Sequence, residues 1–124
     1  MDKFWRAEAM IRTKGDSGIT IEAPTPATEE QIKRIHTATY LDQIRGGTLD
    51  RPATIKLGLP PSAALLARSA LEVGGTLATA QAAWQDGLAC NLAGGTHHAF
   101  PDRGLGYCVL NDVAIAIAEI QATH

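Results

Sequence analysis

Residues 94–108 read GGTHHAFPDRGLGYC, and this stretch carries the strongest signals for both the fold class and the chemistry. Its four glycines let the backbone approach a ligand closely or take up positive φ angles. It also contains the adjacent His97 and His98, and histidine is the residue type most often used for proton transfer near neutral pH. The stretch follows Leu88–Ala93, a short and mostly apolar segment that is typical of a buried parallel strand. Because ligands of open α/β sheets bind beyond the carboxyl ends of strands, we interpret the stretch as a functional loop.

Helical patterns flank this loop on both sides. Pro60-Pro61-Ser62 begins the longest predicted helix, which carries a regular apolar stripe and ends at Gly87. Gly74-Gly75 in its middle costs about 1 kcal/mol per glycine relative to alanine, which indicates that another backbone approaches there. After the loop, Val109–Thr123 is predicted to be a largely buried helix. The two apolar faces comprise Leu66, Ala70, Val73, Leu77, Ala80 and Trp84 in the first helix, and Val109, Val113, Ala116, Ile117 and Ile120 in the second.

The N-terminal half carries shorter patterns. Apolar residues at helical spacing predict a short helix over Phe4–Thr13. Thr28 and Gln31 have the spacing of a capping box, and they predict a helical stretch that breaks near His36 and ends at Gly46-Gly47. Two further segments lack a helical pattern: Ile19–Ala23 is expected to be extended and Thr48–Leu59 to form a loop. Helix, strand, loop and helix at this spacing indicate an α/β layered fold.

Length and composition limit the function classes. The chain has 124 residues, as expected of one domain, and its 45% hydrophobic and 19% charged residues are typical of a globular protein. A net charge of -2 and an aromatic content of 5% argue against a nucleic-acid partner. No apolar run approaches the roughly 18 residues of a membrane span. The charged start of the chain does not resemble a signal peptide, and Cys90 and Cys108 are expected to be reduced and buried, so we predict a cytoplasmic protein.

The histidine pair by itself leaves its role open. Adjacent histidines are more often polar surface residues than a catalytic pair, whereas the neighbouring glycines and the preceding strand favour a functional role. Metal binding by the pair alone is poorly supported, because catalytic zinc usually takes three protein ligands and no cysteine or acidic residue has the local spacing to complete the set. We expect His36 to lie on a helix face, and we assign no role to His124.

A longer pattern around the loop resembles a known family. Residues 91–112, NLAGGTHHAFPDRGLGYCVLND, resemble the tandem-histidine loop of the histone deacetylase family, and the resemblance is strongest to bacterial deacetylase-like and acetoin-utilisation-type proteins. The stretch Ile35–Leu41 is similar to the family's v-H-d-p-x-Y-v pattern, from which Thr37 and Ala38 depart. The end of the long helix, GGTLATAQAAWQDGLACNLAGG, also matches, so the resemblance covers nearly the whole chain.

This resemblance implies a fold and a reaction. The fold would be part of an α/β open sheet of the arginase-deacetylase type, which has three layers in the full family and would here be helix-rich with few parallel strands. Family members use zinc to hydrolyse an N-acetyl amide, typically on lysine or a polyamine. The substrate implied for the full-length family is therefore an acyl-lysine or an acetylated small amine.

The resemblance also implies roles for individual residues of the loop. His97 would orient the attacking water, and His98 would act as general base and then as general acid, a role typically worth about 10²–10⁴-fold in rate. Gly106 and Tyr107 would line the channel for the acyl-lysine chain. Structural roles near the site would fall to Asp102, Cys108, Asn111 and Asp112.

The sequence departs from the family in its metal ligands. The family's D-x-H zinc ligands, its second ligand aspartate and its late transition-state tyrosine have no counterpart here. Residues 1–124 are therefore expected to form a single partial deacetylase-like domain that lacks the family's first strand and C-terminal half. Zinc is expected in the family but not in this chain alone, and whether the chain is itself an enzyme stays open, with catalytic silence favoured.

Two alternatives remain at this point. The chain could be a non-catalytic oligomerising or binding module derived from the same fold. Several copies could also build a new metal site from the histidine pair and a partner carboxylate, for which Asp102 and Asp112 are the nearest candidates. In either case, uncovered apolar faces of the two long helices predict association, most simply a symmetric homodimer.

Overall fold

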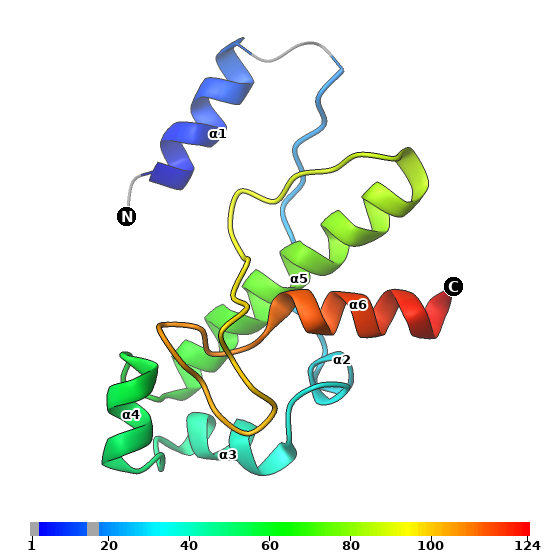
Figure 1. Cartoon of the computed structure of the whole chain (residues 1–124). Helices are drawn as coiled ribbons and strands as arrows, with labels where there is room; N and C mark the ends of the chain where they lie inside the picture. The colour runs from blue at the N-terminus through cyan, green and yellow to red at the C-terminus, as the bar shows by residue number, and fades with distance from the viewer. Residues whose placement is uncertain (1–2, 15–17) are drawn as a thin grey trace.

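The computed structural model describes residues 3–14 and 18–124, and the regular structure in these ranges is helical (Figure 1). No strand occurs in these ranges, and two isolated β-bridges lie within residues 94–108. None of the helices described is both long and apolar enough to cross a membrane. In chain order the helices are α1 (Lys3–Lys14), α2 (Glu29–Lys33), α3 (Ala38–Gly46), α4 (Arg51–Leu57), α5 (Ala63–Asp86) and α6 (Asp112–Thr123).

Local sequence signals start and end most of these helices. At α2, Gln31 N donates a hydrogen bond to Thr28 Oγ1 (3.2 Å) and Thr28 N donates one to Gln31 Oε1 (2.9 Å), which is the predicted capping box. Helix α3 ends at Gly47, whose φ of 66° suits glycine. Helix α5 runs from its cap at Ser62 to Gly87. The helices predicted at these places, and the one near the N-terminus, are confirmed.

The loop predicted over Thr48–Leu59 is wrong, because α4 occupies most of it. Asp50 caps this helix, since its Oδ1 accepts a hydrogen bond from Ala53 N at 2.7 Å. Pro52 lies in the first turn, where a missing N–H group costs little, and Gly58 ends the helix with a φ of 78°. An acidic cap, a proline in the first turn and a final glycine are helix signals that the loop prediction overlooked.

The buried strand predicted at Leu88–Ala93 is also wrong. The segment is irregular, Leu88 is 87% exposed, and Cys90 is exposed rather than buried. A strand needs a hydrogen-bonded neighbour, and within the described ranges no backbone hydrogen bond joins this segment to another extended segment. Ile19–Ala23 carries no regular structure either. The expected parallel strands are therefore missing from the part of the chain that is described, which is helix-rich as expected.

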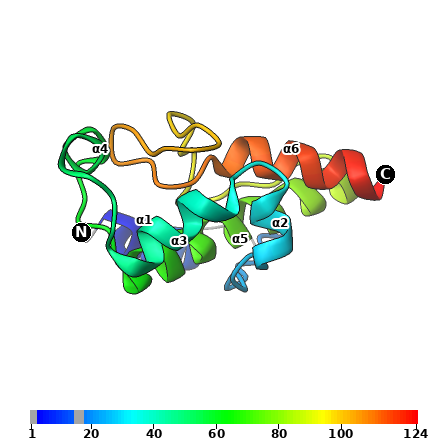
Figure 2. The same cartoon turned by 90° about the horizontal axis from the view of Figure 1, so that it is seen from below.

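The core lies where α5 packs against α6 and α3 (Figures 1 and 2). Most of its side chains are aliphatic, but three of the most deeply buried residues are polar and need partners inside the protein. The largest fully buried side chains are Tyr40, Leu41, Ile44, Leu57, Leu110, Ile115, His36, Val73 and Asp112.

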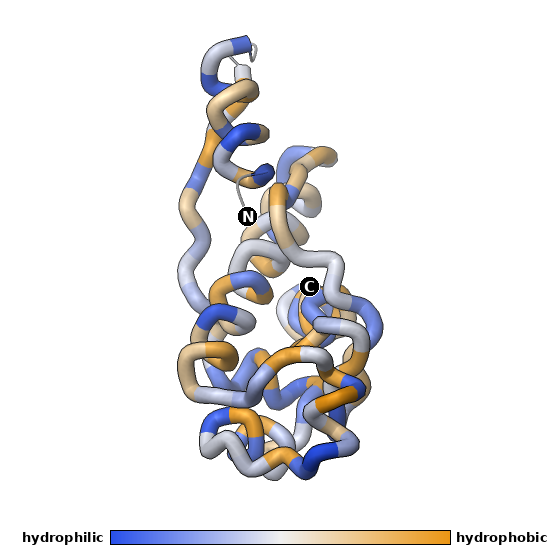
Figure 3. Tube along the Cα trace, turned by 90° about the vertical axis from the view of Figure 1, so that its left-hand side faces the viewer, coloured by the Kyte–Doolittle hydropathy of each residue, from blue (hydrophilic) through white to orange (hydrophobic). Residues whose placement is uncertain are grey.

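The glycine pair in α5 lies where the N-terminal segment crosses the helix. A Cβ atom on Gly74 would lie 1.8 Å from Thr25 O, so only glycine fits. Next to this contact, Ala27 N donates a hydrogen bond to Ala70 O of α5 at 2.9 Å. The predicted close approach of another backbone is confirmed. Helix α1 precedes this segment, contributes no buried residue, and lies apart from the other helices (Figures 1 and 3).

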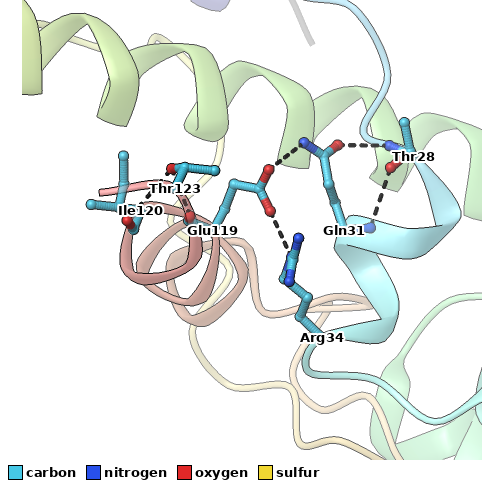
Figure 4. Close-up of polar contacts among 6 residues, drawn as sticks. All are labelled: Thr28, Gln31, Arg34, Glu119, Ile120 and Thr123. Atoms are coloured by element: carbon cyan, nitrogen blue, oxygen red, sulfur yellow. Dashed lines mark hydrogen bonds and ion pairs between the residues drawn. The ribbon is translucent and has the colours of Figure 1, made fainter.

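Glu119 joins α6 to α2 (Figure 4). Its Oε1 accepts a hydrogen bond from Gln31 Nε2 at 3.1 Å, and its Oε2 accepts one from Arg34 Nε at 2.7 Å. Because Gln31 also completes the capping box of α2, one side chain both starts that helix and holds it against α6.

Helix α6 is less buried than its composition predicts. Its inner face carries the fully buried Ile115, whereas Val113 is 40% exposed and Ile117 is 55% exposed. Trp84, the last residue of the α5 stripe, is 61% exposed. The prediction of a largely buried last helix is therefore wrong for its outer face.

Candidate functional site

The candidate loop runs from Gly94 to Asn111 and contains two tight turns. In the first turn, Phe100 N donates a hydrogen bond to Arg103 O at 2.8 Å. In the second, Cys108 N donates one to Leu105 O at 3.0 Å. The two turns fold the loop back on itself, so that residues on both of its limbs approach the start of α6.

The carboxylate of Asp112 holds the residues that precede the histidines. Asp112 is fully buried, and its Oδ2 accepts hydrogen bonds from Thr76 Oγ1 (2.6 Å) and Gly95 N (2.7 Å). Its Oδ1 accepts two more, from Thr96 N (2.7 Å) and Thr96 Oγ1 (3.0 Å). Gly94 has a φ of 88°, and a Cβ atom there would lie 2.5 Å from Asp112 Oδ2. The closely packed turn therefore requires both the carboxylate and the glycine.

Asn111 connects the loop to α6. Its Oδ1 accepts a hydrogen bond from Ala114 N at 3.0 Å, which caps the helix. Its Nδ2 donates to His97 O (3.2 Å) and Ala99 O (3.0 Å), on either side of His98. One side chain therefore fixes the backbone around both histidines.

The two histidine rings lie side by side on the surface. Their centroids are 4.2 Å apart with the planes inclined by 42°, and both residues are exposed. His97 Nδ1 lies 2.8 Å from Gly95 O. Since a carbonyl only accepts hydrogen bonds, this contact places the proton of a neutral His97 ring on Nδ1 and leaves Nε2 as its basic nitrogen.

Gly106 lies next to His98, and both Gly106 and its neighbour Tyr107 are held by α4. A Cβ atom on Gly106 would lie 3.9 Å from His98 Cδ2. Gly106 N donates to Lys56 O (3.0 Å) and Tyr107 N donates to Leu57 O (2.8 Å), so the loop satisfies the last carbonyls of that helix. Tyr107 is 71% exposed and has a φ of 67°, an uncommon conformation for a bulky residue.

The other two candidate residues lie in different surroundings. Asp102 is exposed in the first turn and pairs with Arg103 (Oδ1 to Nη1, 2.9 Å), whose guanidinium lies 3.9 Å from the Phe100 ring centroid. Within the described ranges its side-chain contacts stay in that turn and do not reach the histidines. Cys108 is buried under the second turn. The structure therefore brings together the histidines and Gly106, with Asn111 and Asp112 as their support, whereas the ring of Tyr107 lies against Gly58 at the end of α4.

Two buried residues that support the loop were missed by the sequence analysis. Tyr40 donates a hydrogen bond to Val109 O at 2.9 Å, and burial raises the pKa of its hydroxyl. His36 was expected on a helix face, but it is 1% exposed and its Nε2 accepts a hydrogen bond from Asn111 N at 2.9 Å. Burial lowers the pKa of His36, and the backbone carbonyls of Pro101 and Phe100 partly oppose this shift. Both residues belong to the family-like stretch Ile35–Leu41, which was the available signal.

The residues described do not fit a zinc centre. Among residues 3–14 and 18–124, no three side chains of histidine, cysteine, aspartate or glutamate gather closely enough to hold a metal ion. Catalytic zinc usually takes three protein ligands. Asp112, the buried carboxylate nearest to the loop, already accepts four hydrogen bonds from protein groups.

Two surface cavities of the described residues lie away from the histidines. One, of about 480 Å³, lies between the segment at Thr25–Ala27, α5 and α6. The other, of about 270 Å³, is lined by Tyr40, the start of α4 and the turn at Asp102. Neither of the two cavities is lined by the histidine pair, and both histidines are exposed.

Comparison with known proteins identifies relatives over almost the whole chain. Residues 3–124 match the model of the histone deacetylase domain. The chain is 50% identical over 90 residues to an uncharacterized protein of a Picosynechococcus species (73% of this chain, 30% of that protein). It is 36% identical over 116 residues to the acetoin utilization protein AcuC of Bacillus subtilis (84% and 30%). It is 32% identical over 108 residues to histone deacetylase 8 of Xenopus tropicalis (79% and 29%).

The fold of this chain is also similar to part of a solved structure. The crystal structure of a histone deacetylase homolog from Aquifex aeolicus superposes with a TM-score of 0.74 at 27% identity, over 97% of this chain and 34% of that one. The family resemblance drawn from the loop motif is confirmed. The chain spans about a third of the length of the relatives that it matches.

Proposed function

Since this chain belongs to the histone deacetylase family, we propose that its loop supplies the tandem histidines of a zinc-dependent amidohydrolase site that acts on N-acetyl-lysine or an acetylated polyamine. The observation that carries the proposal is the pair of exposed rings of His97 and His98, 4.2 Å apart, on a loop fixed by buried polar residues. Two adjacent imidazole rings of this kind can accept protons from, and donate protons to, a substrate bound against them.

The two rings have different roles in this proposal. His98 accepts the proton of the attacking water and then donates one to the leaving amine. His97 orients the water through Nε2, because its Nδ1 is engaged with Gly95 O. Proton transfer of this kind typically contributes about 10²–10⁴-fold in rate.

Gly106 and Tyr107 form the substrate-binding part of the proposed site. Gly106 lies beside His98, and its lack of a side chain leaves room for an acyl chain next to the ring. Tyr107 offers an exposed aromatic surface against which the methylene groups of a lysine side chain can pack. Its uncommon backbone conformation supports a functional role, since strain of this kind concentrates at functional sites.

We further propose that these 124 residues are catalytically silent without additional metal ligands. Two histidines can move protons, but amide hydrolysis also needs electrostatic stabilisation of the transition state, worth several kcal/mol. The family obtains this from zinc, for which the described residues offer no ligand set. The ligands of a complete site would come from residues outside this sequence or from a partner chain.

A chimera tests the catalytic role of the loop. The 124 residues would replace the matched segment of Xenopus tropicalis histone deacetylase 8, and hydrolysis of an acetyl-lysine peptide would be measured after zinc loading. We expect turnover that His98→Ala lowers about 100-fold or more and that the control Asp102→Asn leaves unchanged. A folded, zinc-loaded chimera that is inactive, or whose turnover survives His98→Ala, would contradict the proposal.

A non-catalytic oligomerising module is the second candidate function. It is favoured by the large apolar side chains that stand exposed on α6 and after α5, above all Ile117 and Leu88. A metal site shared between copies is a variant of this candidate. The free thiols of Cys90 and Cys108 support a reducing, cytoplasmic location for either function.

A further inference from the structure

His36 is buried beneath the candidate loop and has no part in the proton transfers proposed above. It lies between α2 and α3 and is 1% exposed. Placing a polar ring in the core costs free energy unless its nitrogens are hydrogen-bonded. The hydrogen bonds of the His36 ring therefore indicate its role in the core.

The contact with Asn111 fixes the tautomer of His36. The backbone N–H of Asn111 donates to His36 Nε2 at 2.9 Å. An N–H group can only donate, so Nε2 carries no proton and the proton of the neutral ring is on Nδ1. Nδ1 is buried and has no well-aligned hydrogen-bond partner among the described residues, although the backbone carbonyls of Pro101 and Phe100 act on the ring. The hydrogen bond that the described contacts give to the ring is the one that Nε2 accepts from Asn111.

Asn111 transmits this fixed position to the histidine pair. Its backbone is held by His36, and its side chain donates to His97 O and Ala99 O. The two carbonyls flank His98. A shift of the Asn111 backbone would therefore move the peptide groups that carry both catalytic rings.

The neighbours of His36 hold the same loop at other points. Thr37 N donates to Pro101 O at 2.9 Å, and Tyr40 Oη donates to Val109 O at 2.9 Å. The segment from His36 to Tyr40 thus contacts both limbs of the loop, and His36 holds the point nearest to α6.

We infer that His36 is a positioning residue for the tandem histidines, which acts by fixing Asn111 through its unprotonated Nε2. Among its described contacts it touches neither catalytic ring. The inference rests on the proposed function for the role of the loop. The positioning itself is measured without any enzymatic activity, so either claim can fail while the other stands.

The tautomer of His36 is tested first, in the unsubstituted chain. Long-range ¹H–¹⁵N correlation spectra of ¹⁵N-labelled protein report which ring nitrogen carries the proton, and His36→Gln identifies the signals. We expect a neutral ring with protonated Nδ1 and unprotonated Nε2 at pH 7. A ring protonated at Nε2 would overturn the inference, whatever the behaviour of any variant.

Two substitutions then test the transmission to the loop. In His36→Gln the amide oxygen can accept the Asn111 hydrogen bond, whereas His36→Met fills similar space without a suitable acceptor. We expect the Asn111 amide of His36→Met to exchange about tenfold faster relative to the amides of α5, as for the loss of one hydrogen bond, and the ring signals of His97 and His98 to shift. In His36→Gln, the exchange rate of the Asn111 amide and the ring signals of His97 and His98 should stay close to those of the unsubstituted chain.

A core variant separates positioning from general destabilisation. Ile44 is fully buried in α3, so Ile44→Val loosens the core while leaving the polar contacts of the loop in place. It should leave the histidine signals and the relative exchange of Asn111 unchanged. If His36→Met also leaves them unchanged, or if His36→Gln alters them as much as His36→Met does, His36 does not position the loop.

Discussion

At the scale of single residues, the buried carboxylate of Asp112 determines the conformation of the turn before the histidines. It accepts hydrogen bonds from two backbone N–H groups and two threonine hydroxyls. Hydrogen bonds to a charged group are each typically worth about 1.5–3 kcal/mol, although such contributions do not add. The negative charge also lies at the start of α6, where the helix dipole favours it.

Replacing this carboxylate by an amide should destabilise the chain. We expect Asp112→Asn to lower the free energy of unfolding by about 2–3 kcal/mol. The amide NH₂ group of asparagine is a donor, and it would face groups that now donate hydrogen bonds to the carboxylate. Urea unfolding measures the change. The matched control is Asp102→Asn, in the same loop but exposed, which should change the free energy by less than about 0.5 kcal/mol. Equal stability of the two variants would refute this role of Asp112.

The buried ring of His36 should make stability depend on pH. Burial lowers its pKa below the ordinary value of 6.5, so in the acid range the unfolded chain binds more protons than the folded one. This contribution to stability is complete above pH 6.5 and is lost as the pH falls from 6.5 through the lowered pKa. We expect urea midpoints to fall between pH 7 and pH 5 in the unsubstituted chain, and to fall less in His36→Gln. If the urea midpoints of the two proteins fell equally between pH 7 and pH 5, the pH dependence would not come from His36.

At the scale of elements, α4 positions the substrate-binding part of the proposed site. Its last carbonyls accept hydrogen bonds from Gly106 N and Tyr107 N, and Gly58 at its end lies under the tyrosine ring. A Cβ atom on Gly58 would lie 2.8 Å from Tyr107 Cε1. The end of this helix and the conformation of Tyr107 therefore depend on each other.

A pair of glycine variants tests this dependence. Gly58 and Gly87 both end helices with positive φ (78° and 86°), but a Cβ atom on Gly87 would meet nothing within 4 Å. Both substitutions to alanine should lower the free energy of unfolding by about 1–2 kcal/mol for the backbone conformation alone. Gly58→Ala should cost more and should shift the ring signals of Tyr107 in NMR spectra. Equal losses and an unmoved Tyr107 would contradict the link between α4 and the site.

Elements with local signals were predictable from the sequence, and those that depend on tertiary contacts were not. The ends of α2, α3 and α5 are set by caps and glycines within a few residues, and their predictions hold. The apolar run at Leu88–Ala93 suggested a strand, but an apolar run forms a strand only beside a neighbour that the described ranges do not provide. Helix α4 could have been predicted from Asp50 and Pro52.

The candidate site was predictable to the extent that it is contiguous in sequence. His97, His98, Gly106 and Tyr107 lie within eleven residues, so their pattern was visible. The family-like stretch Ile35–Leu41 marked His36, but its supporting contact could not be predicted, because its partner Asn111 is 75 residues away in the sequence. Burial of a polar residue by distant segments has no periodic signature, and a histidine in a helical stretch is most simply interpreted as surface.

At the scale of the whole molecule, the described helices leave large apolar side chains uncovered. Leu88, Trp84 and Ile117 are each more than half exposed. Covering one large apolar side chain contributes about 1.5–3 kcal/mol of favourable transfer free energy. This exposure supports the proposal that two copies associate through the outer face of α6 in a symmetric homodimer.

Light scattering tests the association. We expect the chain to have the mass of a dimer at tens of micromolar, and Ile117→Lys to shift it towards the monomer because a charge would be buried in the interface. The control is Ile55→Lys, since Ile55 is 69% exposed on α4 and lies outside the proposed interface. A monodisperse monomer at this concentration would exclude the dimer, and equal effects of the two variants would place the interface elsewhere.

The central claim is that these 124 residues supply the histidine pair of a deacetylase site but not its metal-binding part. The most direct test is the zinc content of the purified chain, determined by elemental analysis after dialysis against trace zinc. We predict a stoichiometry far below one ion per chain. A value near one zinc per chain, or per dimer, lost on substitution of His97 and His98, would contradict the claim and show that the pair has become part of an assembled metal site.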